Sequence, residues 1–436
     1  MISRQDLILY MKVASYRERT GVSRAVLPPF VSGFCYSAAI AENWPVAWKS
    51  RREAAAIAEL LSFSDGLTGC WQVQVGSAII LSNGGLIMAR LQLDLDLLRQ
   101  NGQRMADEIR TLGKDWRPHV KAHSQPRIAQ LMVDLGAIGV TAATVAEVEL
   151  MAEAGIPSAL LAHLATEETE LDRLAAASKQ LRLNVCADHF VHVERLAAAA
   201  QRNDTEFDIL VDIDIGMGRT GTRPRIDALT LAKAADKTDR INVAGIMGYE
   251  GHLLTIPDPQ QKQEQIFEAM NLLGQSRDAL KDAGLQCEIV SAGGSGSFWI
   301  TGQHEAVTEL QCGGGAFGDL FYQRTCGLTG VRSALTVVAH VVSRPTLTRA
   351  VVNCGRKAIN PVVHPPEVVG VEGTTVESLS AEHIVLALEG PARDLAIGDE
   401  VRLAVGYSDH SILMHREIEI FEGGEFVETW PVIRNQ

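Results

Sequence analysis

Residues 117–126, RPHVKAHSQP, place a lysine between two histidines at the point where an apolar run gives way to a loop. Most lysines are solvated surface residues, and that is the simpler interpretation of Lys121. A lysine amine at the end of a strand can instead form an imine with a carbonyl compound, with His119 and His123 as neighbouring acid–base groups. What the rest of the chain places beside Lys121 decides between the two interpretations.

Glycine-rich segments accompany two later apolar runs, GGSGS at residues 293–297 and GGGAFGD at residues 313–319. Glycines let backbone N–H groups approach an anion closely, and the hydroxyl of Ser295 adds another donor. Taken alone, such a segment is more often a flexible turn. Because the same chain carries Lys121 at the end of a strand, the first segment predicts a site for a phosphorylated ligand.

Arg219 lies in a third polar segment, DIGMGRTG at residues 214–221. One interpretation is structural, with the guanidinium paired to Asp212 or Asp214. The other is chemical, because a permanently charged arginine beside a pyridine nitrogen would donate a hydrogen bond and keep that nitrogen unprotonated.

The chain that positions these residues alternates short apolar runs with alanine-rich helical patterns. Residues 93–113 predict the first helix, which ends at Gly113. Eight runs are predicted strands: 117–123, 139–144, 158–163, 182–188, 208–216, 243–251, 288–294 and 306–312. Eight strand–helix units in roughly 220 residues predict an α/β fold, a (β/α)8 TIM-type barrel, and a doubly wound open sheet is the alternative.

Polar residues and glycines cluster at the C-terminal end of nearly every predicted strand. They are Lys121, His123, Thr141, Thr144, His163, Asp188, His189, Arg219, Tyr249, His252 and residues 293–297. The active-site groups of a TIM-type barrel lie at the carboxyl ends of its strands. We therefore expect these side chains to surround one site.

Three regions are expected along the 436 residues. Residues 1–90 are an N-terminal extension of unclear role, and residues 91–330 form the barrel. Residues 331–436 are a C-terminal mostly-β domain, because apolar and polar residues alternate there without long helical patterns.

Composition narrows the class of partner. The net charge of −13 and the pI near 5.4 argue against nucleic acid or an anionic membrane and favour a small molecule. Seven scattered cysteines without a C-x-x-C pair fit the reduced thiols of a cytoplasmic protein. The N-terminus is too charged for a secretory signal, and no apolar run is long enough to span a membrane.

Six segments, taken in order, resemble the fold-type III pyridoxal 5'-phosphate enzymes: RPHVKAH, GVTAATVAEVELMAEAGI, DIDIGMGRTG, GYEGH, VSAGGSGSFWITG and TELQCGGGAFGD. Within that group the chain is similar to the D-threonine aldolase and D-serine dehydratase family, whose C-terminal domain resembles NCGRKAI, LSAEHIVL and GDEVRLAVGYSD. The resemblance extends from about residue 90 to the end of the chain. It implies an alanine racemase-type barrel, a homodimer, and a lyase acting on β-hydroxy-D-amino acids.

The resemblance also implies roles for single residues. Lys121 would be the Schiff-base lysine, and the pKa of its amine is expected to fall on partial burial near cationic neighbours. Our own hypothesis adds that Lys121 transfers the Cα proton in a dehydratase reaction, and that His119, His123 or a metal-bound group acts on the substrate's β-oxygen. The implied cofactor-binding residues are Lys121, Arg219 at the pyridine nitrogen, Tyr249 and His252 in the pocket wall, and Gly293, Gly294, Ser295 and Gly296 at the phosphate.

A divalent metal, zinc or manganese, is a further implied cofactor. Lyases of the family bind it through His-x-Asp or His-x-Cys in the last domain, and here that pair falls on Tyr407 and Asp409. His410 or His415 could replace the missing histidine, although neighbouring residues on a strand face opposite sides of the sheet.

Two further departures keep other functions open. Ser124 stands where a second lysine is usual, and Gly315 where the strand-eight motif commonly has a tyrosine. An amino-acid racemase needs no metal but normally needs a second base, which Gly315 does not supply. A non-catalytic cofactor-binding protein is the other alternative, and the choice between aldolase and dehydratase also stays open.

Overall fold

The protein is described by a computed structural model over residues 72–75, 78–81 and 89–434. The chain divides into two compact units, Met1–Gly85 and Leu86–Gln436. In the first unit, β1 (Gln72–Val75) and β2 (Ala78–Leu81) pair antiparallel. The rest of the predicted extension, up to residue 88, lies outside the described residues.

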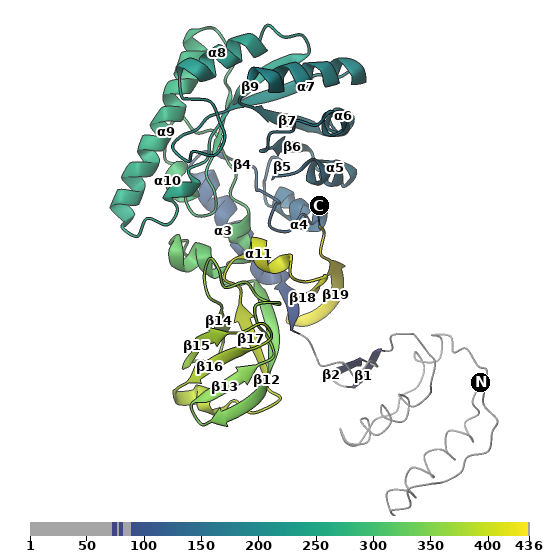
Figure 1. The fold of residues 1–436 in the computed structure, drawn as a ribbon, viewed down its shortest axis with the longest axis vertical. Coiled ribbons are helices and arrows are strands. Elements are labelled where there is room, and N and C mark those ends of the chain that lie inside the picture. Colours follow the sequence, from purple (N-terminus) through teal and green to yellow (C-terminus); the bar gives the residue numbers. More distant parts are fainter. Residues whose placement is uncertain (1–71, 76–77, 82–88, 435–436) are drawn as a thin grey trace, which may run out of the picture. The chain divides into compact units, whose positions relative to one another are not determined.

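An eight-stranded parallel sheet forms the first half of the second unit, in the order β4-β11-β10-β9-β8-β7-β6-β5 (Figure 1). A parallel bridge between His119 and Thr141 connects the segment after β4 to β5, so the two ends of the sheet meet. The strands are β4 (Asp115–Trp116), β5 (Val140–Ala142), β6 (Ser158–Leu161), β7 (Arg182–Ala187), β8 (Phe207–Asp212), β9 (Ile241–Met247), β10 (Ile289–Ala292) and β11 (Glu309–Leu310). The predicted barrel is thereby confirmed, and the open sheet is not what forms.

Helices connect these strands, as the alternating pattern predicts. They are α3 (Leu95–Thr111), α4 (Pro126–Asp134), α5 (Val145–Glu153), α6 (Glu168–Ala177), α7 (Phe190–Asn203), α8 (Ile226–Ala235), α9 (Pro259–Asp282) and α10 (Phe298–Thr301). Local sequence fixes where several begin: the Thr144 hydroxyl accepts from the Glu147 N–H before α5, and Asp258 with Pro259 starts α9.

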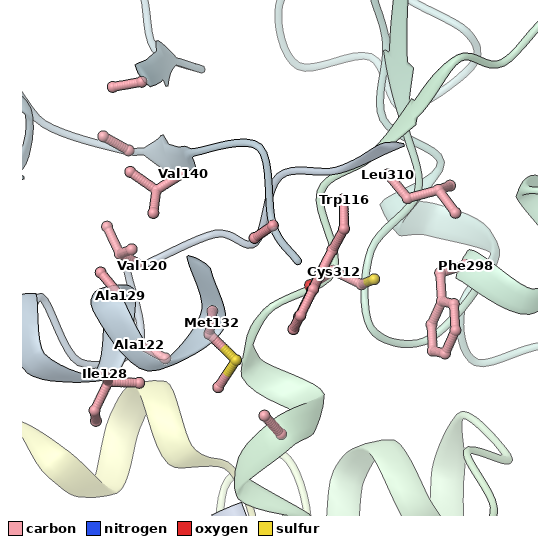
Figure 2. Close-up of a cluster of buried hydrophobic side chains, with 14 of the residues drawn as sticks. Trp116, Val120, Ala122, Ile128, Ala129, Met132, Val140, Phe298, Leu310 and Cys312 are labelled. Carbon is pink, nitrogen blue, oxygen red and sulfur yellow. The ribbon is translucent and has the colours of Figure 1, made fainter. Parts of the chain in front are cut away.

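The barrel core is closed where its first and last strands meet. Trp116 of β4 donates from Nε1 to the backbone oxygen of Cys312, at 2.7 Å, just beyond β11. Figure 2 shows Trp116 and Cys312 side by side among apolar side chains of α4 and the neighbouring strands. A buried indole N–H needs such a partner, so the contact lets a large side chain fill this position.

The C-terminal half is a nine-stranded sheet whose main order is β15-β16-β13-β12-β3-β18-β19, with β17 pairing β12 and β14. Its strands are β3 (Arg90–Asp94), β12 (Leu335–Thr346), β13 (Arg349–Val352), β14 (Glu367–Val369), β15 (Thr374–Leu379), β16 (Ile384–Leu388), β17 (Glu400–Ala404), β18 (Glu417–Glu422) and β19 (Glu425–Pro431). The predicted mostly-β domain is present, with one short helix, α11 (Ser408–Ile412), at its junction with the barrel (Figure 1).

Two regions differ from the expected boundaries. The first predicted strand, residues 117–123, is a loop with one isolated bridge at His119, and β4 (Asp115–Trp116) precedes it. Residues 90–94 form β3 between β12 and β18, although residue 90 was expected in the N-terminal extension and residues 91–94 in the barrel region, partly within its first helix. Leu91 and Leu93 are buried there, because their two-residue spacing puts both on one face of the sheet. The helical pattern begins only after Asp94, whose side chain accepts from the Leu97 N–H.

Two other expectations concern membrane-spanning helices and the state of the cysteines. In the described part of the chain, no helix is both long and apolar enough to cross a membrane. Cys186, Cys287, Cys312, Cys326 and Cys354 are all buried free thiols.

Candidate active site

A cavity of about 390 Å³ opens at the C-terminal ends of the barrel strands. It brings together most of the predicted site residues: His119, Lys121, Arg219, Tyr249, Gly293, Gly294, Ser295 and Asp409. His123, His252 and Gly296 are not among its lining residues. Thr141, Thr144, Asp188 and His189, which were also expected to surround the site, do not line the cavity either, so the strand ends converge only in part.

Lys121 reaches the cavity from the loop that follows the bridge at His119. Its Nζ lies 2.7 Å from Asp409 Oδ2 and 3.3 Å from the Tyr407 hydroxyl, and its side chain is 43% exposed. Burial by itself would lower the pKa of Lys121, but the Asp409 carboxylate and Tyr407 raise it above its ordinary value. The expectation of a lowered pKa was wrong in the structure, because the nearest charge is an anion.

The two histidines beside Lys121 make the same kind of backbone contact but have different surroundings. His119 Nδ1 accepts from the Lys121 N–H at 3.3 Å, and His123 Nδ1 accepts from the Gln125 N–H at 2.8 Å. Burial lowers the pKa of His123 to about 3, and burial with the Lys121 charge lowers that of His119 well below its usual value. Both rings are therefore neutral near pH 7. His119 lines the cavity, whereas the ring of His123 packs beside Phe317 at a centroid distance of 5.7 Å.

The glycine segment after β10 forms another part of the cavity wall. A side chain on Gly294 would come within 2.9 Å of the Tyr249 ring, so the close approach of Tyr249 requires glycine there. Behind the segment, the fully buried Glu250 accepts from the Ser297 hydroxyl at 2.6 Å and the Gly293 N–H at 3.4 Å. The backbone of this loop is thus held in place by a carboxylate that sequence patterns do not single out.

Lys262, on α9, holds the other end of the same loop. Its Nζ donates to the backbone oxygens of Gly296 and Cys326, each at 2.7 Å, and lies 5.1 Å from the centroid of the Trp299 ring. The side chain is buried, and burial lowers its pKa. In the sequence it is an ordinary polar residue of a helix, so no pattern could have identified it.

Replacing Lys262 by methionine is expected to weaken cofactor binding about tenfold or more, because two charge-assisted hydrogen bonds that fix the loop are lost. A spectrophotometric titration with pyridoxal 5'-phosphate measures the dissociation constant. Lys357→Met, on an exposed lysine paired with Glu382, is the matched control and should bind as wild type does. Equal affinity of the Lys262 variant would show that this lysine does not hold the loop.

Arg219 lines the cavity with its guanidinium carbon 5.8 Å from the centroid of the Tyr249 ring. The two aspartates that could have paired with it have other donors. Asp212 Oδ2 accepts from the Thr220 hydroxyl at 2.8 Å, and Asp214 Oδ1 accepts from two backbone N–H groups at 3.0 Å. Arg219 is thereby left to face the cavity.

Asp409 and His410 lie on α11 and not on a strand, so the opposite-face argument that was made against His410 does not apply. Tyr407 is the residue before the helix, and Asp409 is in its first turn. The N–H and hydroxyl of Ser408 both donate to Asp319 Oδ2, at 3.0 and 2.7 Å, which fastens α11 to the loop after β11. Burial raises the pKa of Asp319 to about 7 and, with the Asp409 charge, that of Tyr407 to about 12.

These residues do not fit the divalent metal that the family implies. Asp409 is engaged by the Lys121 ammonium, and Tyr407 supplies a protonated hydroxyl where an imidazole would stand. His410 packs edge-on against the Tyr407 ring at 4.9 Å, and His415 Nε2 lies 2.7 Å from the Ala358 oxygen. Across residues 89–434, no three His, Cys, Asp or Glu side chains are grouped so that they could hold a metal.

The same cavity does fit pyridoxal phosphate. It is lined by the lysine amine of Lys121, by Gly293, Gly294 and Ser295, and by Arg219 with its guanidinium. Its volume is within the range of pockets that enclose a small cofactor. One cavity therefore offers Lys121 for the cofactor's aldehyde, the glycine loop for its phosphate and Arg219 for its ring nitrogen.

The comparisons with known proteins agree with this geometry. Residues 93–320 match the family model described as alanine racemase, N-terminal domain, and residues 334–421 match the putative serine dehydratase domain. The chain is 32% identical over 351 residues to the 3-hydroxy-D-aspartate aldolase of Paracoccus denitrificans (strain Pd 1222), covering 78% of this chain and 90% of that protein. It is 27% identical over 318 residues to the D-threonine aldolase of Arthrobacter sp, covering 72% and 84%.

A solved structure gives the same result for the fold. The D-threonine aldolase from Filomicrobium marinum has a TM-score of 0.74 and 32% identity to this chain, over 79% of this chain and 94% of that one. Sequence and fold therefore agree over the barrel and the C-terminal sheet. This chain belongs to the fold-type III pyridoxal-phosphate enzymes, in the family of D-threonine aldolases and D-serine dehydratases.

Proposed function

We propose that this chain is a pyridoxal-phosphate-dependent lyase that cleaves β-hydroxy-D-amino acids and works as a homodimer. The observation that carries the proposal is Lys121, whose amine enters a cavity that is also walled by the glycine loop at residues 293–295. The relatives named above act on 3-hydroxy-D-aspartate and D-threonine, and both compounds carry a hydroxyl on Cβ.

In this proposal the cofactor is held by four groups of the chain. Lys121 would bind its aldehyde covalently, the loop of Gly294 and Ser295 would hold its phosphate, Arg219 would donate to its ring nitrogen, and Tyr249 would pack beside it. When bound, pyridoxal phosphate supplies an electron sink for the electron pair left on the substrate Cα.

The chain's own residues then handle the protons. After the substrate amine has replaced Lys121 on the cofactor, the Lys121 amine would be free to carry a proton to or from the substrate Cα. His119, neutral and facing the cavity, is a neighbouring donor or acceptor. A racemase is disfavoured, because Gly315 offers no second base and its N–H donates to the Ser295 hydroxyl at 2.8 Å.

A proton NMR time course tests the proposal. Purified protein with added pyridoxal phosphate is incubated with D-threonine or 3-hydroxy-D-aspartate, and the L-isomers serve as stereochemical controls. We expect glycine and the corresponding aldehyde from the D-isomers only, whereas a 2-oxo acid with ammonia would identify a dehydratase. No product from any of these substrates would contradict the proposal.

A further inference from the structure

We propose that Tyr407 and Asp409 replace the metal of related lyases and form a metal-independent site for the substrate's β-hydroxyl, with Asp409 as the base that takes its proton. The inference rests on the proposed function and deepens it, because it assigns the group that starts Cα–Cβ cleavage. It arises from a disagreement, since the family implies a metal at the position where this chain presents a tyrosine and a lysine-bound carboxylate.

The position of Asp409 suits this role. Its carboxylate lines the cavity and lies 2.7 Å from the amine of Lys121, the group that acts at Cα. Cβ is bonded directly to Cα, so a hydroxyl on Cβ falls within the reach of a carboxylate beside that amine. The side chain of Asp409 is only 12% exposed, which keeps it from being satisfied by bulk water.

Asp409 also has unused capacity to accept a hydrogen bond. Its Oδ1 is buried and has no hydrogen-bond partner among the described residues. A buried carboxylate oxygen without a donor is costly, so a ligand that brings a hydroxyl to this carboxylate regains that free energy. Gly314 leaves room beside it, because even a Cβ at that position would stay 3.6 Å from Oδ1.

Tyr407 supplies the complementary donor. Its hydroxyl lies 3.3 Å from Lys121 Nζ, so it faces the same point as Asp409. Its ring is fixed by edge contacts with Phe321 and His410, at centroid distances of 5.4 and 4.9 Å. A rigid phenol can donate to the β-oxygen of the substrate while the carboxylate accepts the hydroxyl proton, and this orients the Cβ–O bond.

The proton balance closes within the site. The β-hydroxyl proton passes to Asp409, the O–H electron pair forms the aldehyde C=O, and the Cα–Cβ bond breaks with its electron pair left on Cα. The aldehyde departs, and the proton crosses the 2.7 Å contact to the Lys121 amine, which delivers it to Cα to give glycine. No co-reactant is needed.

The test combines metal binding with kinetics. Wild type, Tyr407→His, Asp409→Asn and the exposed control Asp394→Asn are dialysed against a chelator, and zinc and manganese binding is then titrated by calorimetry. We expect wild type to bind no stoichiometric metal and to keep its cleavage rate after chelation. Tyr407→His, which restores a His-x-Asp pair, should bind metal measurably.

Kinetics of the same proteins assign the base. Asp409→Asn should lower kcat about 10²- to 10⁴-fold while its cofactor absorbance stays that of wild type, and Asp394→Asn should match wild type in both. Cleavage that stops on chelation and returns with manganese would overturn this inference alone, as would an unchanged rate in Asp409→Asn. Failure of untreated wild type to cleave any β-hydroxy-D-amino acid would overturn the proposed function as well.

Discussion

Lys121→Ala is expected to lower the turnover of β-hydroxy-D-amino acids by about 10³-fold or more, since one amine both holds the cofactor and moves the Cα proton. The glycine loop and Arg219 remain in the variant, so non-covalent binding of the cofactor should persist. Borohydride reduction followed by mass spectrometry separates the two modes of binding. Wild type should gain the mass of the reduced cofactor at Lys121, and the variant should gain none.

Lys179→Ala is a suitable control for this experiment. Lys179 belongs to the same barrel, is exposed, and donates only to the Asn203 backbone oxygen at 2.7 Å in the contacts that the structure describes. On borohydride treatment the Lys179 variant should gain the mass of the reduced cofactor at Lys121, and it should turn over substrate as wild type does. If Lys121→Ala were labelled to full stoichiometry at another lysine, or kept its turnover, the assignment of Lys121 would be wrong.

The largest stability effect is expected inside the barrel, where Arg117 and Glu309 form a buried ion pair. Arg117 Nε lies 3.0 Å from both carboxylate oxygens, Nη1 donates to Ser158 at 2.8 Å, and the two side chains are 2% and 3% exposed. Glu309→Gln leaves a buried guanidinium without its countercharge. We expect the free energy of unfolding to fall by about 3–5 kcal/mol, measured by urea denaturation.

A surface pair provides the comparison. Asp107→Asn breaks the contact between Asp107 and Arg110, whose side chains are both exposed, and should lower the free energy of unfolding far less than Glu309→Gln does. A double variant, Arg117→Met with Glu309→Leu, should recover much of the lost stability, because no charge is then left buried. If Glu309→Gln cost no more than Asp107→Asn, the pair would not be holding the barrel together.

The sequence predicts the barrel because most of its strands are largely buried and therefore appear as short apolar runs, as in β6 and β8. The same property explains why many of the polar residues at strand ends converge on one cavity. β4, which has two residues of which one is exposed, gives no such run. β3 was harder to recognise, since its five residues run directly into α3 and its alternation merges with the helical pattern. Its partners, β12 and β18, lie more than 200 residues away, and only the folded chain reveals them.

Charged residues behind the cavity could not be predicted in this way. Glu250 and Lys262 are buried only because the loop after β10 folds over them, and nothing local in the sequence marks a buried charge. His119 and His123 each accept a hydrogen bond from the backbone N–H two residues further on, yet only His119 lines the cavity, and the local sequence does not distinguish them. The contact of Asp409 with Lys121 joins residues 288 positions apart.

The place of β3 has a consequence for how this protein is made. Because β3 lies between β12 and β18, the first described strand of the second unit pairs with strands that are translated more than 200 residues later. α11, which brings Asp409 to Lys121, is likewise translated long after the lysine. The barrel strands therefore leave the ribosome before Lys121 can gain its carboxylate neighbour, 288 positions further along the chain.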